Sequence, residues 1–306
     1  MLNQEIAVDV DCLRNEAAKL TKPLSDRLGF ETGVFVSAIP SDWVSKVRKL
    51  ADESGVSSLE RKRLLEFAHN ARKRWLLPPL NTDESDDWIK DVKCAIDAGV
   101  LAGAISDQNR PGFVSLEDAI FGAGSDLLLP RISMQIQTTV SSHLAVLRPL
   151  ILKSSELHIV DSYAFRLFDG RSRDLWLQLL KGMQRLTLRS STPMVRLFVH
   201  LWPGQQNVPS VESLQQSVAD INIELRSVRS SPLQVSIALR DGEIEHDRFV
   251  LSVKGGLSLG RGIMLVDETR LVDGKHHTHV SYLSRAALDF YHRQFVGSLD
   301  SCDVIS

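Results

Sequence analysis

The chain has 306 residues, of which 43% are hydrophobic and 24% are charged. This composition is typical of a folded globular protein and excludes extended disorder, and the length predicts two domains. Because the formal net charge is −2, no overall positive charge attracts nucleic acid or anionic lipid, so a site for either must be a local patch.

The start of the chain and its cysteines favour a cytoplasmic protein. The first residues, MLNQEIAVDVDC, lack the basic start and apolar core of an export signal, and no apolar stretch approaches the ~20 residues that span a bilayer. Cys12, Cys94 and Cys302 are odd in number and widely separated. This argues against a disulfide framework or a cysteine-built zinc site.

Residues 1–150 are predicted to form a mainly helical domain of unknown role. Helical spacing runs from Asp9 to Lys153, interrupted by Gly and Pro. The clearest helix begins near Ser58 as its N-cap and continues through LERKRLLEFAHNARKRWL. Its apolar positions form one stripe: Leu64, Ala68, Ala71 and Trp75.

Two basic triplets on this helix are candidates for contact with phosphates: Arg61-Lys62-Arg63 and Arg72-Lys73-Arg74. Because consecutive helical residues point in different directions, neither triplet can lie on a single face. We therefore interpret them first as a solvated surface. The acidic segment NTDESDDW that follows is expected to cap a helix from Asp86 to Leu101.

The segment between Pro130 and Lys153, RISMQIQTTVSSHLAVLRPLILK, is predicted to be an apolar helix that joins the two domains. It contains His143, which has no metal-binding partner three or four residues away. We interpret His143 as a packed helix residue in preference to a ligand.

Residues 151–306 are predicted to form an α/β domain, a mixed sheet flanked by helices. Strand and helix patterns alternate in the order β-α-β-α-β-β-β-α, and the crossovers place parallel strands side by side. We predict that five segments belong to one sheet: Leu157–Phe165, Val195–Trp202, Val235–Leu239, Arg248–Val253 and Leu257–Ile263. Such sheets bind ligands beyond their strand ends.

Within this domain, the segment EHDRFVLSVKGGLSLGRGI, residues 245–263, resembles the phospholipase D superfamily motif H-x-K-x4-D-x6-G-S-x-N. His246 and Gly260 match the motif, and Arg248 replaces its Lys. Three positions have diverged from Asp, Ser and Asn: Val253, Arg261 and Ile263.

The resemblance implies how these residues would act. In the family the His attacks phosphorus, the Lys neutralises phosphate oxygens, and the Asp orients the imidazole. His246 is thus the candidate catalytic residue, and the candidate phosphate-binding residues are Arg248, Lys254, Gly260 and Arg261. A second motif is needed for full activity. One copy gives half a site, which a homodimer would complete.

The strings HDR and GRG resemble more closely the phospholipase-D-like C-terminal domain of MIT-domain proteins, a phosphoanion-binding, non-catalytic branch. This resemblance implies a phosphodiester-binding module that is catalytically weak or inactive. We favour nucleic acid over membrane phosphoinositide as its ligand, because no polybasic or apolar membrane-facing segment is visible. By analogy, the protein would belong to a larger assembly, such as a bacterial antiviral defence or mobile-element system.

Two alternatives remain open. One is an active, metal-independent dimeric nuclease or phosphodiesterase, with His246 supplied by each chain. The other is a structural, partner-binding protein with a vestigial motif, in which Gly255-Gly256 makes a hairpin turn while His246 and Arg248 face solvent.

Three histidines gather in DGKHHTHVSYL: His276, His277 and His279. Metal sites usually add a distant ligand, and none is visible, so we interpret the segment as a hydrated loop and predict no metal or cofactor. A weaker alternative is that one of these histidines supplies the missing acid of the phospholipase-D-like site.

Overall fold

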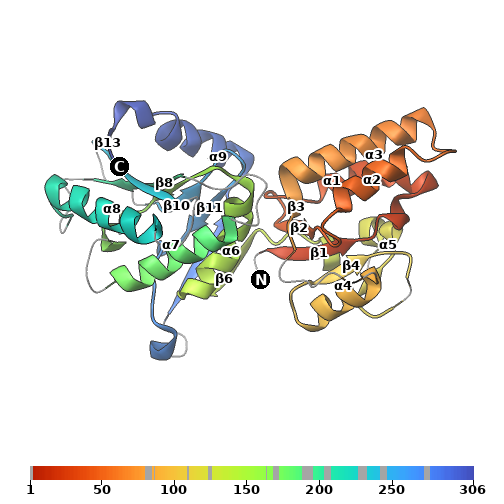
Figure 1. Cartoon of the computed structure of the whole chain (residues 1–306), viewed down its shortest axis with the longest axis horizontal. Coiled ribbons are helices and arrows are strands. Elements are labelled where there is room, and N and C mark those ends of the chain that lie inside the picture. The colour runs from red at the N-terminus through yellow and green to blue at the C-terminus, as the bar shows by residue number, and fades with distance from the viewer. Residues whose placement is uncertain are drawn as a thin grey trace. The chain divides into compact units, whose positions relative to one another are not determined.

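The computed structural model describes residues 3–79, 85, 87–108, 110–122, 126–162, 164–167, 172–187, 196–202, 208–226, 233–241, 247–271 and 276–306. The chain forms two compact units, Asn3–Ile132 and Ser133–Ser306 (Figure 1). This division falls earlier than the boundary expected after residue 150. The reason is that strand β6 (Ser133–Gln137) pairs within the second sheet and helix α6 (Val140–Lys153) packs against helix α7 (Arg173–Thr187).

The first unit contains a five-stranded sheet in the order β3-β2-β1-β4-β5, with every neighbouring pair parallel. Its strands are β1 (Gln4–Val8), β2 (Val34–Ser37), β3 (Leu76–Leu77), β4 (Gly103–Ile105) and β5 (Phe113–Val114). Its helices are α1 (Thr21–Asp26), α2 (Trp43–Ala51), α3 (Ser58–Asn70), α4 (Trp88–Asp97) and α5 (Leu116–Phe121). Short 3₁₀ or π segments are η1 (Asp11–Leu13), η2 (Asn15–Leu20), η3 (Ala71–Trp75) and η4 (Asp126–Leu128).

The expectation of a mainly helical first domain is therefore incomplete: helices supply most of its regular structure among the described residues, but a five-stranded parallel sheet was not predicted. Strands β1 and β2 are buried along their whole length, so they lack the alternation of polar and apolar residues that marks a half-exposed strand. Polar residues in β1 are satisfied internally: Ser37 Oγ donates to Glu5 Oε2 at 2.7 Å, and Gln4 Nε2 donates to the carbonyl oxygen of Leu127 at 2.8 Å.

Helix α3 follows the sequence pattern closely. Its N-cap is Ser57, one residue before the predicted one, and Ser57 forms a reciprocal capping box with Glu60. The predicted stripe is buried: Leu64, Ala68, Ala71 and Trp75. Figure 1 shows α2 and α3 on one side of the sheet and α4 on the other.

The second unit contains an eight-stranded sheet in the order β13-β9-β8-β7-β10-β11-β12-β6. Strands β7, β8 and β9 are parallel, and the remaining pairs are antiparallel. The strands after β6 are β7 (Glu156–Val160), β8 (Arg196–Leu201), β9 (Gln234–Leu239), β10 (Phe249–Leu251), β11 (Gly256–Leu259), β12 (His277–Tyr282) and β13 (Asp303–Ile305).

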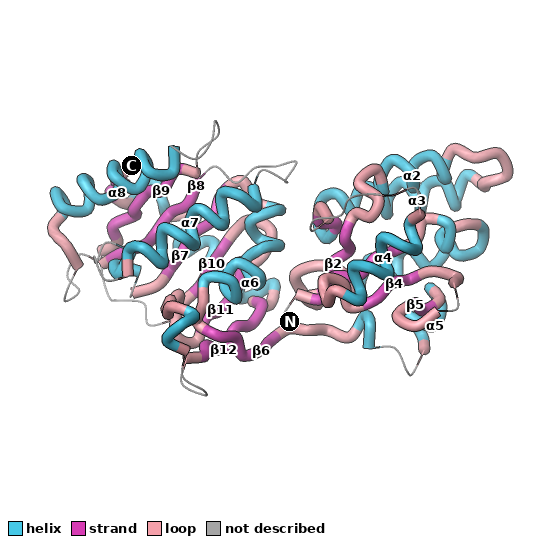
Figure 2. Tube along the Cα trace, turned by 60° about the horizontal axis from the view of Figure 1, so that its bottom comes forward, coloured by secondary structure: helices cyan, strands magenta, loops and turns pink. Residues whose placement is uncertain are grey.

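Helices α6, α7 and α8 (Val211–Arg226) lie across one face of this sheet, as Figure 2 shows. Helix α9 (Arg285–Tyr291) continues into the π-helical segment η7 (His292–Val296). The remaining short segments are η5 (Ala164–Leu167), η6 (Glu268–Arg270) and η8 (Leu299–Ser301). Among the described residues, no helix combines the length and apolar character needed to cross a bilayer.

The predicted sheet is confirmed for the described residues, because all five predicted segments contribute strands to it. Two neighbouring predictions are wrong. Residues 133–137 form strand β6 where a helix was expected, and only the part from Val140 onward is helical. Residues 277–282 form strand β12 where a hydrated loop was expected.

A hydrogen-bonded chain of polar side chains, buried except for the half-buried Glu156, crosses the three parallel strands. His158 Nε2 lies 2.9 Å from Glu156 Oε1, and His158 Nδ1 lies 3.0 Å from His200 Nε2. Arg240 Nε donates to His200 Nδ1 at 2.9 Å, and the same guanidinium donates to the carbonyl oxygen of Phe295 in η7. Because Arg240 can only donate, the protons are assigned in one direction: Arg240 to His200, His200 to His158, and His158 to Glu156.

This order gives each ring nitrogen of His158 and His200 a suitable hydrogen-bond partner only while both imidazoles are neutral. An added proton on His200 would place an N–H against the Arg240 donor. Accordingly, burial and then the charge of Arg240 lower the pKa of His200 well below 6.5. Burial also lowers the pKa of His158, with Glu156 opposing the shift.

We predict that the free energy of unfolding falls as pH drops below 6.5. Because the folded-state pKa values of His158 and His200 lie below the unfolded value of 6.5, the unfolded chain binds protons first. Stability is thus fully present above pH 6.5 and is lost below it. The loss approaches about 1.4 kcal/mol per histidine for each pH unit until the folded-state pKa is reached. Urea denaturation at pH 7.5, 6.5 and 5.5 measures it.

Two variants identify the source of this pH dependence. His200→Gln should lower stability at pH 7.5 but flatten the dependence. The exposed His69 on α3 offers the matched control, and His69→Gln should keep the wild-type profile. An unchanged pH dependence in His200→Gln would rule out the buried network as its cause.

Candidate phosphate site

The candidate site lies at the carboxyl end of β7, beside the start of β10. The parallel strands β7, β8 and β9 all end at this edge, which is where open α/β sheets bind ligands. Strand β10 runs antiparallel to β7, and its first residue, Phe249, pairs with Val160. Arg248 and Asp161, the next residues outward, therefore stand opposite each other on one face.

A buried carboxylate organises this corner. The side chain of Asp161 is 2% exposed, and its Oδ1 lies 3.6 Å from Nε of Arg248, whose side chain is 19% exposed. The amide of Ile263 donates to Asp161 Oδ2 at 2.9 Å, and Arg248 Nη1 donates to the carbonyl oxygen of Gly260 at 2.7 Å. Burying a carboxylate is costly unless a cation and hydrogen-bond donors compensate it, and both are present.

The second glycine of the GRG string is required by this packing. Gly262 has φ +70, and a Cβ added there would lie 2.1 Å from Asp161 Oδ2 and 2.8 Å from Cδ of Arg248. Both distances are shorter than atoms tolerate. Glycine thus lets the backbone pass directly over the Asp161–Arg248 pair.

The first turn of α6 borders the same corner through His143. This residue is fully buried, and its Nδ1 lies 2.8 Å from the carbonyl oxygen of Thr139. Burial lowers the pKa of His143, while the carbonyls of Thr139 and Gly262 oppose the shift. His143 is therefore a packed, neutral helix residue, in keeping with the sequence interpretation.

The other predicted site residues are spread over the hairpin. His246 lies outside the described residues. Lys254 follows β10 in the hairpin turn, at the opposite end of that strand from Arg248, so the two do not share a site. Arg261 is exposed next to the corner, with its amide donating to Thr278 Oγ1 at 3.0 Å. Val253 is 61% exposed in the turn and orients nothing.

The histidines of β12 point away from Arg248. The amide of Gly260 donates to the carbonyl oxygen of His279, whereas Arg248 lies opposite Leu259, one residue earlier. Because successive strand residues face opposite sides of the sheet, His277 and His279 lie on the other face. Neither is placed to act as an acid at the Arg248 corner.

Asp161 is the site residue that sequence reasoning missed. The signal was present in IVDSY, where an acidic residue directly follows a buried strand. Such a residue lies at the carboxyl edge of a parallel sheet, where ligand and charge-pairing groups gather. Only the pairing of β7 with β10 brings Arg248 to this carboxylate.

The carboxyl edge of the first sheet is also polar. Ser106, which follows β4, donates from Oγ to Oδ2 of Asp9, which follows β1, at 2.8 Å. Burial, followed by the charge of Asp9, raises the pKa of the Cys12 thiol. A cavity of about 330 Å³ opens here, with Lys49 and Trp88 in its wall. Throughout the described ranges, no group of three or more His, Cys, Asp or Glu is arranged to hold a metal ion.

Comparisons with known proteins add little to this geometry. No family model matches the chain, and no curated protein matches it either. Among solved structures, the chain is similar to TrmBL2, described as an archaeal chromatin protein with a novel mode of DNA binding. That alignment covers 56% of this chain and 53% of TrmBL2, at 10% identity and a TM-score of 0.29. So slight a likeness carries no conclusion about fold or function.

We predict that Gly262→Ala lowers the free energy of unfolding by at least about 3 kcal/mol, because the new Cβ displaces a buried ion pair. Gly99→Ala is the matched control, since Gly99 also has φ +70 but has nothing within 4 Å of a built Cβ. The control should lose only the ~1–2 kcal/mol of a left-handed alanine. Equal losses in urea denaturation would contradict the close approach at Gly262.

Proposed function

We propose that the second unit binds a phosphate or phosphodiester group at the carboxyl end of β7, with Arg248 as its anchor. The observation that carries this proposal is the Asp161–Arg248 pair, which fixes a guanidinium at the sheet edge where α/β folds bind ligands. A guanidinium is permanently charged and fits a phosphate with two parallel hydrogen bonds.

The revised site is smaller than the motif alone suggested. Arg248, Gly260 and Arg261 lie together, and Lys254 is left out. Glycine at 262 lets the backbone pass close to Arg248, and the carbonyl oxygen of Gly260 accepts a hydrogen bond from its Nη1. Nucleic acid is the proposed ligand class, and a bacterial defence or mobile-element assembly is the proposed setting, by analogy.

Catalysis at this site is proposed to be absent or very slow. The position that should orient the nucleophilic histidine is Val253, which points into solvent. The nearby carboxylate, Asp161, is engaged by Arg248 and the amide of Ile263. In other histidine-centred sites, losing the orienting carboxylate costs on the order of 10⁴-fold in rate.

We predict that Arg248→Ala weakens binding of a short labelled oligonucleotide, because a charge-assisted contact contributes about 1.5–3 kcal/mol. Arg248→Lys should recover only part of the loss. Since Arg248→Ala leaves Asp161 buried without its cation, the variant Asp161→Asn/Arg248→Ala is included: it keeps an acceptor for the Ile263 amide and should bind as weakly. Fluorescence anisotropy gives each affinity.

The control for this titration is Arg285→Ala. Arg285 is an exposed arginine of α9 that pairs with Asp289 at 3.2 Å, so its loss removes the same charge elsewhere in the unit. It should bind as the wild type does. If Arg248→Ala and Asp161→Asn/Arg248→Ala both fold and both bind with wild-type affinity, the anion site lies elsewhere.

We predict further that phosphodiester turnover, where detectable, is slow and unaffected by chelator, because the superfamily chemistry uses imidazole in place of a metal. Labelled single- and double-stranded DNA and RNA are incubated with wild type and His246→Ala in chelator. Efficient cleavage that disappears in His246→Ala would contradict the binding-module proposal and favour the dimeric nuclease. Cleavage that survives in the mutant would indicate another site or a contaminant.

A further inference from the structure

Helix α3 and its π-helical continuation η3 carry the two basic triplets 11 residues apart. Eleven residues are slightly more than three α-helical turns, and Leu64 and Trp75, which are also 11 residues apart, are both buried. Corresponding members of the two triplets therefore lie on about the same side of this helical stretch. The aligned pairs are Arg61 with Arg72, Lys62 with Lys73, and Arg63 with Arg74. Each triplet is spread around the axis, but together the triplets form parallel rows about 16 Å long.

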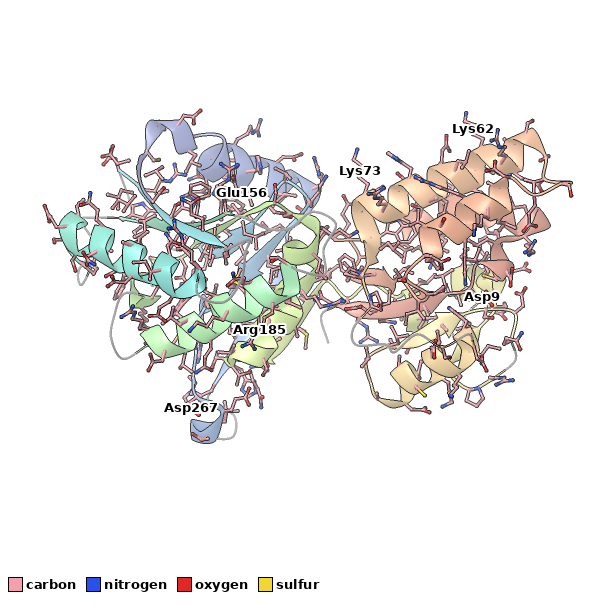
Figure 3. All side chains as sticks on the ribbon, in the orientation of Figure 1. Asp9, Lys62, Lys73, Glu156, Arg185 and Asp267 are labelled. Atoms are coloured by element: carbon pink, nitrogen blue, oxygen red, sulfur yellow. The ribbon has the colours of Figure 1, made fainter. Side chains whose placement is uncertain are left out.

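These rows face outward because the opposite side of the helix is buried. Lys62, Lys73 and Arg74 are exposed and Arg63 is half-buried. Figure 3 shows Lys62 and Lys73 near the two ends of this helical stretch, on the side away from the sheet. Residues 58–75 contain six basic and two acidic residues, a formal charge of +4 in a chain whose net charge is −2. We call the six basic residues of this stretch the α3 basic surface: Arg61, Lys62, Arg63, Arg72, Lys73 and Arg74.

Most of this positive charge is not neutralised within the unit. Arg61 pairs with Asp52 at 2.9 Å. Among the described residues, Lys62, Arg63, Lys73 and Arg74 form no salt bridge, although the charge of Arg63, after the hydrogen bonds from Ser57, helps to lower the pKa of Glu60. The surface therefore has charge available for a partner.

The surface is also hollowed. A cavity of about 330 Å³ lies between α1 and α3, and four of its lining residues are basic: Lys22, Lys62, Arg63 and Arg74. Two acidic residues, Asp26 and Glu66, also line the space, and Asp26 lies 3.7 Å from Lys22. A concave, mainly cationic hollow of this size accommodates a phosphate group with its ester substituents.

We propose that the α3 basic surface binds the phosphate backbone of a nucleic acid, a duplex in the first instance. Its two cationic ends lie about 16 Å apart, with Glu66 and His69 between them. That arrangement matches two separate runs of phosphates, such as those bordering a major groove about 12 Å wide.

A lipid surface fits these residues less well. A helix that binds in a membrane interface turns its apolar face to the lipid. Here the apolar face packs into the unit through Leu64, Phe67 and Trp75, which are 0–2% exposed. The remaining exposed apolar residues, Leu59 and Leu65, are too few to anchor a helix.

The test is a titration of a labelled 20-base-pair duplex with the full chain over a series of salt concentrations. Lys62→Gln/Lys73→Gln should weaken binding about tenfold at low salt and reduce the slope of log K against log salt by about 2, because each lost phosphate contact contributes about 0.9. The loss should not depend on base sequence.

The matched control is Lys90→Gln/Lys93→Gln on α4, which removes the same charge from the same unit. It should keep the wild-type affinity and slope. An unchanged slope in the α3 variant, or an equal loss in the control, would overturn the proposal. So would binding to phosphatidylserine vesicles, sensitive to the α3 variant, without binding to the duplex. Circular dichroism verifies that each variant is folded.

Failure here and failure of the Arg248 site are distinguishable, because the changes lie in different units. Arg248→Ala is titrated alongside. A loss confined to the α3 variant supports the α3 basic surface and counts against Arg248 as the anchor. A loss confined to Arg248→Ala supports the reverse assignment.

Discussion

The second unit depends on neutralising one buried carboxylate, that of Asp161. Left unpaired at 2% exposure, a carboxylate would cost several kcal/mol or would take up a proton. Arg248 supplies the charge and the amide of Ile263 supplies a donor. Because these two residues flank the β10–β11 hairpin, the same contacts fix the hairpin's register against β7. A glycine at 262 is the steric condition that lets the hairpin close there.

Strand β7 has polar side chains on both of its faces that must be compensated inside the sheet. On the side of α6, Asp161, which directly follows β7, pairs with Arg248. On the side of α9, Glu156 and His158 belong to the hydrogen-bonded series of side chains that ends at Arg240. In both cases an arginine from outside the strand compensates polar groups buried in the middle of an eight-stranded sheet. Neutral histidines extend the second pairing across three strands. Both arrangements specify one register, since a slip of one residue would exchange the faces.

The sequence predicts the second unit far better than the first, for physical reasons. The predicted segments Val195–Trp202 and Val235–Leu239 are alternating runs with β-branched residues, and helix-length stretches separate them, so the pattern identifies them. Strands β1 and β2 are short and buried on both faces, so no alternation distinguishes them from helix. Strand β12 does alternate, with His277 and His279 on one face and Thr278 and Val280 buried on the other. It was missed because closely spaced histidines after a glycine were interpreted as a hydrated loop. The Asp161–Arg248 pair joins residues 87 positions apart, which only tertiary pairing reveals.

Binding energy also limits what the Arg248 site can do alone. A single charge-assisted contact contributes about 1.5–3 kcal/mol, less than the roughly 4 kcal/mol that corresponds to a millimolar Kd. A site with one arginine could therefore select a phosphate, but it would not by itself retain a nucleic acid at cellular salt. Retention needs several phosphates neutralised together, since each releases counterions. Residues 58–75 carry a formal charge of +4 in a chain whose net charge is −2, and under the proposal for α3 they would supply this retention. If both proposals hold, the first unit would bind the backbone through α3 and the second would recognise a single phosphate at Arg248.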